Sequence, residues 1–230
     1  MNTKDLDSNL SLVAKIFKKN KIHYWLCHGT LLGIIRDKKI MEWDDDIDIA
    51  VWETDISRDR LIKIMNLNDF KLQTDTFFED DNILYFNRPG GRIVDIHFYK
   101  IEYNKLTNKD SAVIYSVYIP KNIFMKLIDA LSMAKNYNGK FKYIIKMFFI
   151  FQNFFQFIKS KLIKNKIFYR SVGCFEPLEF LKEFKEINFY DTFLTVPVKS
   201  EDILKYAYGE DWKTPKKNCY YLPGQGLGQD

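Results

Sequence analysis

The chain has 230 residues, 47% hydrophobic and 28% charged, the composition of a globular protein of one domain, or of one domain with an appended lobe. Residues 1–9 lack the basic start and the apolar stretch of a secretory signal peptide, so we expect a cytoplasmic protein. The three cysteines are far apart and form no C-x-x-C pair, so they do not suggest a disulfide framework, and we expect free thiols. Cys27–His28 is the only adjacent Cys/His pair, so we do not expect a structural zinc site.

The net charge of +5 is concentrated in one segment. Residues 130–175 contain nine basic side chains and no acidic one, which leaves the rest of the chain net negative. We therefore expect this segment, rather than the whole surface, to meet an anionic partner. The nine residues are Lys135, Lys140, Lys142, Lys146, Lys159, Lys161, Lys164, Lys166 and Arg170.

Hydrophobic periodicity in the first 120 residues predicts several strands and few helices. The expected helices are 7–20, 31–36 and 57–66, the last one capped by Ser57. The expected strands are 23–26, 46–51, 70–72, 83–87, 92–99 and 113–119.

The second half of the chain has a helical pattern. Apolar side chains recur at steps of three and four over residues 121–162, with an interruption expected at Asn138–Gly139. Another helix is expected over 200–208, ended by the glycine that follows it. We therefore expect a catalytic core at residues 1–120 and a mainly helical extension at residues 121–230 that packs on it.

The strongest functional signal is the segment Glu42–Ile49, with the sequence E-W-D-D-D-I-D-I. Alternate side chains of a strand share a face, so Asp46 and Asp48 point to one side while the isoleucines face the core. Adjacent carboxylates repel each other unless a cation neutralises them, and hard oxygen ligands suit Mg²⁺ or Mn²⁺. Asp95, in the alternating run Ile93–Phe98, is placed to supply a third carboxylate from a neighbouring strand.

Gly29 and Thr30 follow a predicted strand and begin a helix-like run. A glycine at such a position lets the backbone approach a phosphate, and the hydroxyl and the first helical N–H groups can bind it. Arg36 can add a two-point phosphate contact. Its alternative role is a structural ion pair with Asp44 or Asp45.

Simpler interpretations compete with these. Consecutive aspartates commonly form a solvated loop or a helix cap, but here the apolar alternation continues through them. An EF-hand calcium loop needs glycine where Ile49 stands and is excluded. Asp95 is alternatively an ordinary edge-strand residue. His97 shares its face and is better interpreted as a packed or solvated histidine than as a catalytic one.

The stretch Gly29–Arg36, G-T-L-L-G-I-I-R, followed by Trp43–Ile49, W-D-D-D-I-D-I, resembles the signature of the LicD/fukutin-like phosphotransferases, a family of the DNA polymerase β nucleotidyltransferase superfamily. Tyr208–Trp212 with Pro215 is similar to the closing stretch of that family. The resemblance implies an α+β nucleotidyltransferase fold, with a mixed β-sheet flanked by helices and a helical C-terminal part. His28 departs from the pattern, since a small residue is commoner there, and the zinc-binding insertion of the animal members is not visible.

The resemblance further implies transfer of a phospho-alcohol, such as phosphocholine or ribitol phosphate, from a CDP-linked donor to a hydroxyl of a cell-surface or lipid-linked glycan. Asp46 and Asp48 match its metal-binding pair, and Asp95 matches its third carboxylate, a candidate base for the acceptor hydroxyl. Two alternatives stay open. One is an enzyme that attaches a nucleoside monophosphate to a small molecule or protein and releases pyrophosphate. The other is a nucleotide-binding module without turnover, against which the presence of all three carboxylates argues.

The basic, phenylalanine-rich segment 135–170 also has two interpretations. Its central part, residues 144–158, is too short and too polar to span a bilayer. It is either a buried core helix with lysines reaching solvent from its ends, or a helix on the inner membrane surface, where a lipid-linked glycan would be presented. No nucleic-acid partner is expected, because the phenylalanines form a continuous apolar stripe and not a stacking platform.

Overall fold

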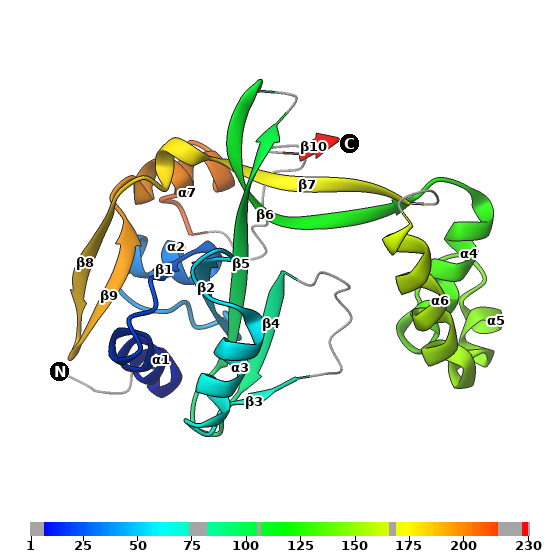
Figure 1. Ribbon diagram of the computed structural model, residues 1–230, viewed down its shortest axis with the longest axis horizontal. Helices are drawn as coiled ribbons and strands as arrows, with labels where there is room; N and C mark the ends of the chain where they lie inside the picture. The colour runs from blue at the N-terminus through cyan, green and yellow to red at the C-terminus, as the bar shows by residue number, and fades with distance from the viewer. Residues whose placement is uncertain (1–6, 74–81, 105–106, 166–168, 216–226, 230) are drawn as a thin grey trace.

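The structure is a computed structural model that describes residues 7–73, 82–104, 107–165, 169–215 and 227–229 (Figure 1). Its main body is a mixed sheet with the strand order β1-β2-β5-β6-β7-β10, in which β4 also pairs with β5, and β3 with β4. β2 and β5 run parallel, and the other pairs of this sheet are antiparallel. The strands are β1 (Trp25–Leu26), β2 (Asp46–Trp52), β3 (Lys71–Leu72), β4 (Ile83–Asn87), β5 (Ile93–Asn104), β6 (Lys109–Pro120), β7 (Tyr169–Pro177) and β10 (Leu227–Gln229).

The strand β5 connects two parts of this sheet. Residues 93–99 of β5 pair with β2 on one side, and 94–97 pair with β4 on the other. Residues 100–104 pair instead with β6, which continues alongside β7 as a long ribbon (Figure 1). The first part of β5 is thus a central strand beside β2, and a central strand is buried on both faces.

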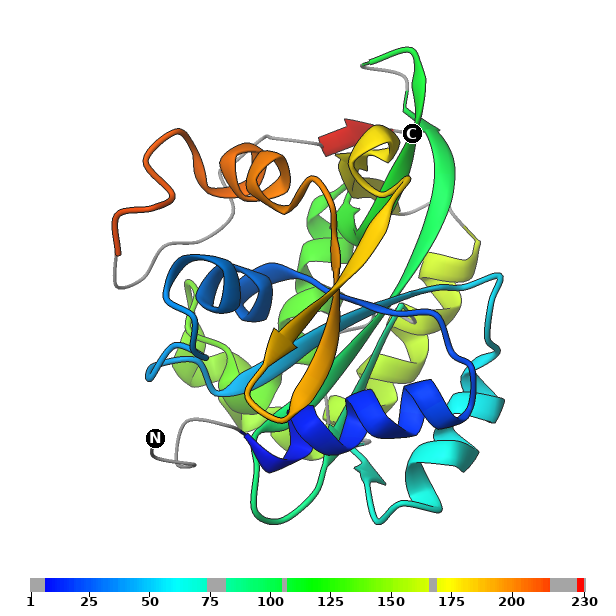
Figure 2. The same ribbon diagram turned by 90° about the vertical axis from the view of Figure 1, so that its left-hand side faces the viewer.

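Four α-helices, one short 3-10 helix and a β-hairpin of the described residues cover the body. Figure 2 shows α1 and the hairpin β8–β9 on the side that faces away from the helical lobe. These elements are α1 (Ser8–Lys19), α2 (His28–Arg36), α3 (Arg58–Asn66), α7 (Ser200–Tyr208), the short helix η4 (Leu178–Phe180), β8 (Phe184–Phe189) and β9 (Thr192–Pro197). The carboxylate of Asp7 caps α1, and the Ser57 hydroxyl caps α3 as expected. α7 ends at Gly209, whose φ of 93° favours glycine.

One large hydrophobic core unites the two ends of the chain. It takes side chains from α1, β1, α2, β2 and β5, and also from the hairpin, α7 and Trp212. Residues 181–212 therefore return to the body formed by the first 100 residues. The Ser11 hydroxyl of α1 and the Thr192 hydroxyl of β9 lie 2.8 Å apart and fasten these two elements across the core.

Residues 121–165 form a separate helical lobe at the far end of the β6–β7 ribbon (Figure 1). Its buried hydrophobic residues belong to two small clusters that are distinct from the main core. The lobe consists of α4 (Ile123–Ser132), η2 (Ala134–Asn136), α5 (Lys142–Met147), η3 (Phe149–Phe151) and α6 (Gln152–Lys164). Among the described residues, no helix has the length and apolar character needed to cross a bilayer.

The expected α+β fold, a mixed sheet flanked by helices, is confirmed. The helical pattern after residue 121 continues only to residue 164, because strands β7, β8 and β9 follow it. The interpretation of residues 144–158 as a buried core helix is wrong, since most large apolar side chains there are exposed. The division of the chain into two domains at residue 120 stays a prediction. Residues 224–230 form a glycine-rich tail, of which only 227–229 lie within the described residues.

Candidate active site

Three carboxylates meet on one face of the parallel strand pair. Asp46 and Asp48 lie on β2, and Asp95 lies on β5 directly opposite Asp48 in the strand register. One oxygen from each carboxylate lies within 4.8 Å of the others. Asp48 and Asp95 are buried, with 7% and 9% of their surface exposed, whereas Asp46 is half-buried. Alternation sets the face on which each carboxylate lies, and the parallel register of β2 with β5 brings the three together.

The N-terminus of α2 fixes Asp48. The Thr30 backbone N–H donates to Asp48 Oδ2 at 3.4 Å, and the Asp48 backbone N–H donates to the Thr30 hydroxyl at 2.8 Å. The Gly29 backbone N–H also stabilises the ionised carboxylate. The positive end of the helix dipole thus faces a carboxylate of the protein itself. Thr30 is fully buried, so its hydroxyl joins α2 to β2.

Asp44 is a fourth member of the cluster, which the sequence analysis did not assign to the site. A Cβ atom at Gly29 would lie 2.7 Å from Asp44 Oδ2, so the glycine leaves room for this carboxylate. Burial and the charges of Asp48 and Asp46 raise the pKa of Asp44 to about 7. The only sequence signal for this role was its place in the acidic run.

Burial and mutual repulsion shape the protonation of the whole cluster. Burial, followed by the charges of Asp46, Asp48 and Asp44, raises the pKa of Asp95 to about 8. The pKa values of Asp46 and Asp48 are raised as well, mainly by burial. Asp95 Oδ1 and Asp44 Oδ2 are buried and have no hydrogen-bond partner among the described residues. A set of crowded oxygen donors with unpaired buried atoms fits a hard divalent cation.

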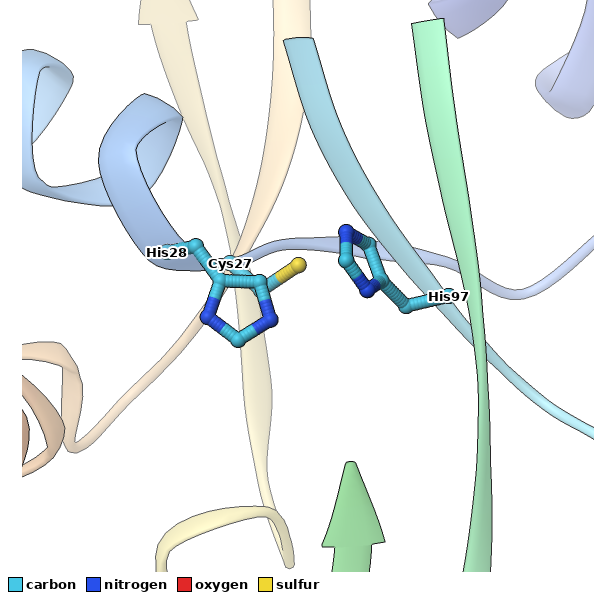
Figure 3. A group of neighbouring side chains, drawn as sticks. All are labelled: Cys27, His28 and His97. Carbon is cyan, nitrogen blue, oxygen red and sulfur yellow. The ribbon is translucent and has the colours of Figure 1, made fainter. Parts of the chain in front are cut away.

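Two histidines, His28 and His97, lie close together (Figure 3), and His97 contacts one of the carboxylates. His97 Nε2 lies 3.2 Å from Asp48 Oδ1, and the rings of His97 and His28 lie 4.6 Å apart. Burial lowers the pKa of His97 to about 4 and that of His28 to about 3, so both rings are neutral near pH 7. When Asp48 is ionised its carboxylate only accepts hydrogen bonds, and the tautomer of His97 that fits this contact donates from Nε2. The packed histidine expected from the sequence therefore also orients a member of the carboxylate cluster.

The Cys27 thiol lies beside the two imidazoles (Figure 3), and a ligand atom from each of Cys27, His28 and His97 lies within 4.8 Å of the others. Burial raises the pKa of Cys27 well above its usual value, which disfavours the thiolate that a soft metal requires. A metal bound through His97 Nε2 would also break its hydrogen bond to Asp48. We therefore assign the hydrogen-bonding role to His97 and no metal to this group.

Comparison with known protein families shows the family to which the chain belongs. A model described as LicD/FKTN/FKRP, nucleotidyltransferase domain, matches residues 21–199, more than half of the sequence. The chain belongs to the LicD/FKTN/FKRP family. It is accordingly a transferase-type domain, and the expected nucleotidyltransferase fold is that of its family.

Two curated relatives match the LicD-family chain over a short stretch. They are the uncharacterized proteins RP689 of Rickettsia prowazekii (strain Madrid E) and RT0683 of Rickettsia typhi (strain ATCC VR-144 / Wilmington), each 44% identical over 41 residues. This stretch is 18% of the present chain and 15% or 13% of the relatives' length. A similar solved structure is the lincomycin-bound lincosamide antibiotic adenylyltransferase LnuA, with 14% identity, a TM-score of 0.44, and coverage of 91% of this chain and 87% of that one.

Arg36 of this LicD-family domain lies at the opposite end of α2 from the carboxylates. Its guanidinium makes a two-point ion pair with Asp37, with distances of 2.8 and 2.7 Å. A nine-residue helix rises by about 12 Å, so the two ends of α2 are well separated. The proposed phosphate contact of Arg36 stays a prediction, as does phosphate binding by Gly29 and Thr30.

Arg92 is a positioning residue that the sequence did not reveal. Its Nε–H donates to the backbone carbonyl of Asp44 at 2.7 Å, and its Nη1 pairs with Asp7 at 3.2 Å. Arg92 thus ties the acidic loop before β2 to the cap of α1. No motif identified this contact, because it depends on three segments that are distant in sequence.

His28, the first residue of α2, has an unusual backbone conformation. Its φ of 45° lies in the left-handed region, which disfavours residues with a Cβ atom. The ring contact with His97 is a local interaction that accompanies this strained conformation.

Proposed function

We propose that this LicD-family domain transfers a phosphorylated group from a nucleotide-linked donor to an acceptor hydroxyl, using Mg²⁺ or Mn²⁺ held by Asp46, Asp48 and Asp95. The observation that carries this proposal is the convergence of three carboxylate oxygens, within 4.8 Å of one another, from two adjacent parallel strands. A divalent cation bound there would offset the carboxylate repulsion and the negative charge of donor phosphates.

The protein groups have separate tasks in this proposal. Asp48 is held rigid by the N-terminus of α2 and by His97, so its orientation is fixed before the donor arrives. Asp46 is half-buried and lies on the more open side of the cluster. Asp95 has a buried oxygen without a hydrogen-bond partner among the described residues, so it is the group that we propose to accept the proton of the acceptor hydroxyl.

Family membership and the motif resemblance support a finer proposal: the donor is a CDP-linked alcohol, and a phospho-alcohol is moved to a glycan or a lipid-linked glycan. In that reaction the acceptor oxygen forms a bond to the phosphorus of the alcohol phosphate, and the bond to cytidine monophosphate breaks. The proton of the acceptor passes to Asp95. Cytidine monophosphate leaves.

The test is to incubate the purified protein and Mg²⁺ with CDP-choline, CDP-ribitol and CDP-glycerol, and separately with nucleoside triphosphates, in the presence of glycan acceptors. Formation of cytidine monophosphate that is absent with Asp48→Asn supports the proposal, and the exposed neighbour Asp45→Asn serves as the matched control. Release of pyrophosphate from a triphosphate would instead show nucleotidyl transfer. No metal-dependent product with any donor, together with no Mn²⁺ binding, would contradict the proposed activity.

A further inference from the structure

The helical lobe of residues 121–165 has very little interior. Its buried hydrophobic side chains form one cluster of four and another of two, both separate from the main core. They are Ala130, Leu131, Ala134 and Ile145 in the first cluster, and Met125 and Ile128 in the second. These six are few for a lobe of this length, and two of them are alanines, so burial within the lobe contributes little to its stability.

The apolar surface of this lobe is exposed instead. Of the twenty large hydrophobic side chains that are exposed in the described residues, fourteen lie in the lobe. Ile150 is 74% exposed and Met147 77%. An exposed apolar area of this kind marks a surface that binds a partner or a membrane. The fourteen are Ile123, Phe124, Leu127, Met133, Phe141, Tyr143, Ile144, Met147, Phe148, Phe149, Ile150, Phe151, Phe154 and Phe157.

Polar groups join the helices from within. Lys159 is buried and its Nζ lies 2.8 Å from the Asp129 carboxylate of α4. The half-buried Gln156 side chain donates to the Ser132 carbonyl at 3.2 Å, and at the surface the Lys135 N–H donates to Gln152 Oε1 at 2.9 Å. A buried lysine between two helices, with exposed phenylalanines on the outside of the lobe, departs from the usual arrangement of a protein in water.

The positive charge of the lobe indicates what kind of partner its apolar surface binds. Residues 121–165 contain nine lysines and a single acid, Asp129, which is already paired with Lys159. Exposed lysines stand among the exposed aromatics: the Nζ atoms of Lys140 and Lys142 lie 5.3 and 5.2 Å from neighbouring aromatic rings. A second copy of the lobe would bring like charges together, whereas an anionic bilayer offers both acyl chains and negative headgroups.

We propose that the lobe is a membrane-docking surface that lies on a bilayer containing anionic lipids. The exposed residues of η3, Phe149–Phe151, and their neighbours enter the boundary of the acyl chains, and the lysines contact the phosphates of the headgroups. Since no described helix can cross a bilayer, the contact is peripheral. This inference concerns residues outside the carboxylate cluster and does not depend on the proposed reaction.

The test is co-sedimentation of the full chain with vesicles of phosphatidylcholine alone and of phosphatidylcholine with phosphatidylglycerol, at low and high salt. We expect binding to the anionic vesicles that weakens with salt. The variant K140Q/K142Q/K146Q should lower this binding by about a hundredfold, because each lysine near an anionic surface contributes a similar electrostatic factor. The variant F149S/I150S/F151S should abolish it.

Matched controls come from exposed residues of the body. K15Q/K63Q/K71Q removes the same charge, and L67S/F193S removes exposed apolar side chains, and both should bind vesicles as the unaltered chain does. Far-ultraviolet circular dichroism checks that each variant is folded; if the η3 variant is not, the lysine variant decides. Absence of vesicle binding at low salt would overturn the proposal. So would equal binding to both vesicles, or concentration-dependent self-association that F149S/I150S/F151S removes while vesicle binding persists.

Discussion

Replacing Asp95 by Asn should stabilise the protein when no divalent cation is present. In the folded state the pKa of Asp95 is raised from 3.8 to about 8, because it is buried among Asp46, Asp48 and Asp44. Between these two values the folded protein holds a proton that the unfolded chain has released. Stability therefore falls as the pH rises through this window. Asparagine does not ionise, so the variant does not lose this stability as the pH rises.

The size of the effect follows from the two pKa values. As the pH rises from about 6 to about 8, one carboxyl group with this shift lowers the free energy of unfolding by about 2 kcal/mol. For a protein of this length, that lowers the melting temperature by several degrees. In the presence of EDTA, Asp95→Asn should lose less stability over that interval than the unaltered protein, by about this amount. The comparison requires urea or thermal unfolding at both pH values.

Mg²⁺ should reverse the order of the two proteins. A cation that binds the folded state stabilises it in proportion to its affinity, and the variant lacks one ligand. Asp45→Asn, an exposed change in the same loop, should behave as the unaltered protein does under every condition. An equal pH dependence in Asp95→Asn and the unaltered protein with EDTA would refute the reasoning about charge crowding.

Three further predictions concern the same cluster. Asp46→Asn or Asp48→Asn should abolish turnover and leave the circular dichroism spectrum unchanged, because each change removes a repelling charge; undiminished activity would exclude them as metal ligands. Asp95→Asn should lower the rate by orders of magnitude and keep donor binding within roughly tenfold, about 1.4 kcal/mol by calorimetry, and a complete loss of binding would make it chiefly a ligand. His97→Phe should weaken Mn²⁺ binding measured by electron paramagnetic resonance by about tenfold, because Asp48 loses an orienting donor; unchanged affinity would show that this hydrogen bond is dispensable.

The central part of the fold could be predicted from local patterns. In β2 and β5 the apolar alternation continues through the acids, and this placed Asp46, Asp48 and Asp95 on one face of two neighbouring strands. The caps of α3 and the end of α7 also followed from nearby residues, since a cap depends on side chains within one turn.

Features that depend on distant segments could not be predicted in this way. Asp44 joins the site because Gly29, on another element, leaves space for its carboxylate. Arg92 holds the acidic loop through contacts with Asp44 and Asp7, which lie in two segments that no sequence spacing relates to it. The strands β8 and β9 were not predicted. They are stabilised by their pairing with each other and by the contact of β9 with α1, and short strands carry a weak periodic signal in the sequence.

The orientation of the lobe helices was the largest departure from the sequence expectation. Periodicity shows that one face of a helix is apolar but not which surroundings that face meets. In residues 144–158 the stripe was compatible with a protein core, and only the exposed fractions of the phenylalanines distinguish the two cases.

The β6–β7 ribbon has a consequence for the geometry of the whole molecule. It is the connection between a lobe with an apolar surface and a body that holds the carboxylates (Figure 1). The nine residues of β7 extend over roughly 30 Å, so the ribbon acts as a spacer of defined length. Strand side chains alternate with a period of two, so adding two residues to each strand would lengthen the spacer by about 7 Å without reversing its faces. When the lobe lies on a membrane as proposed, the number of paired residues in β6 and β7 therefore sets the distance between the carboxylates and that membrane.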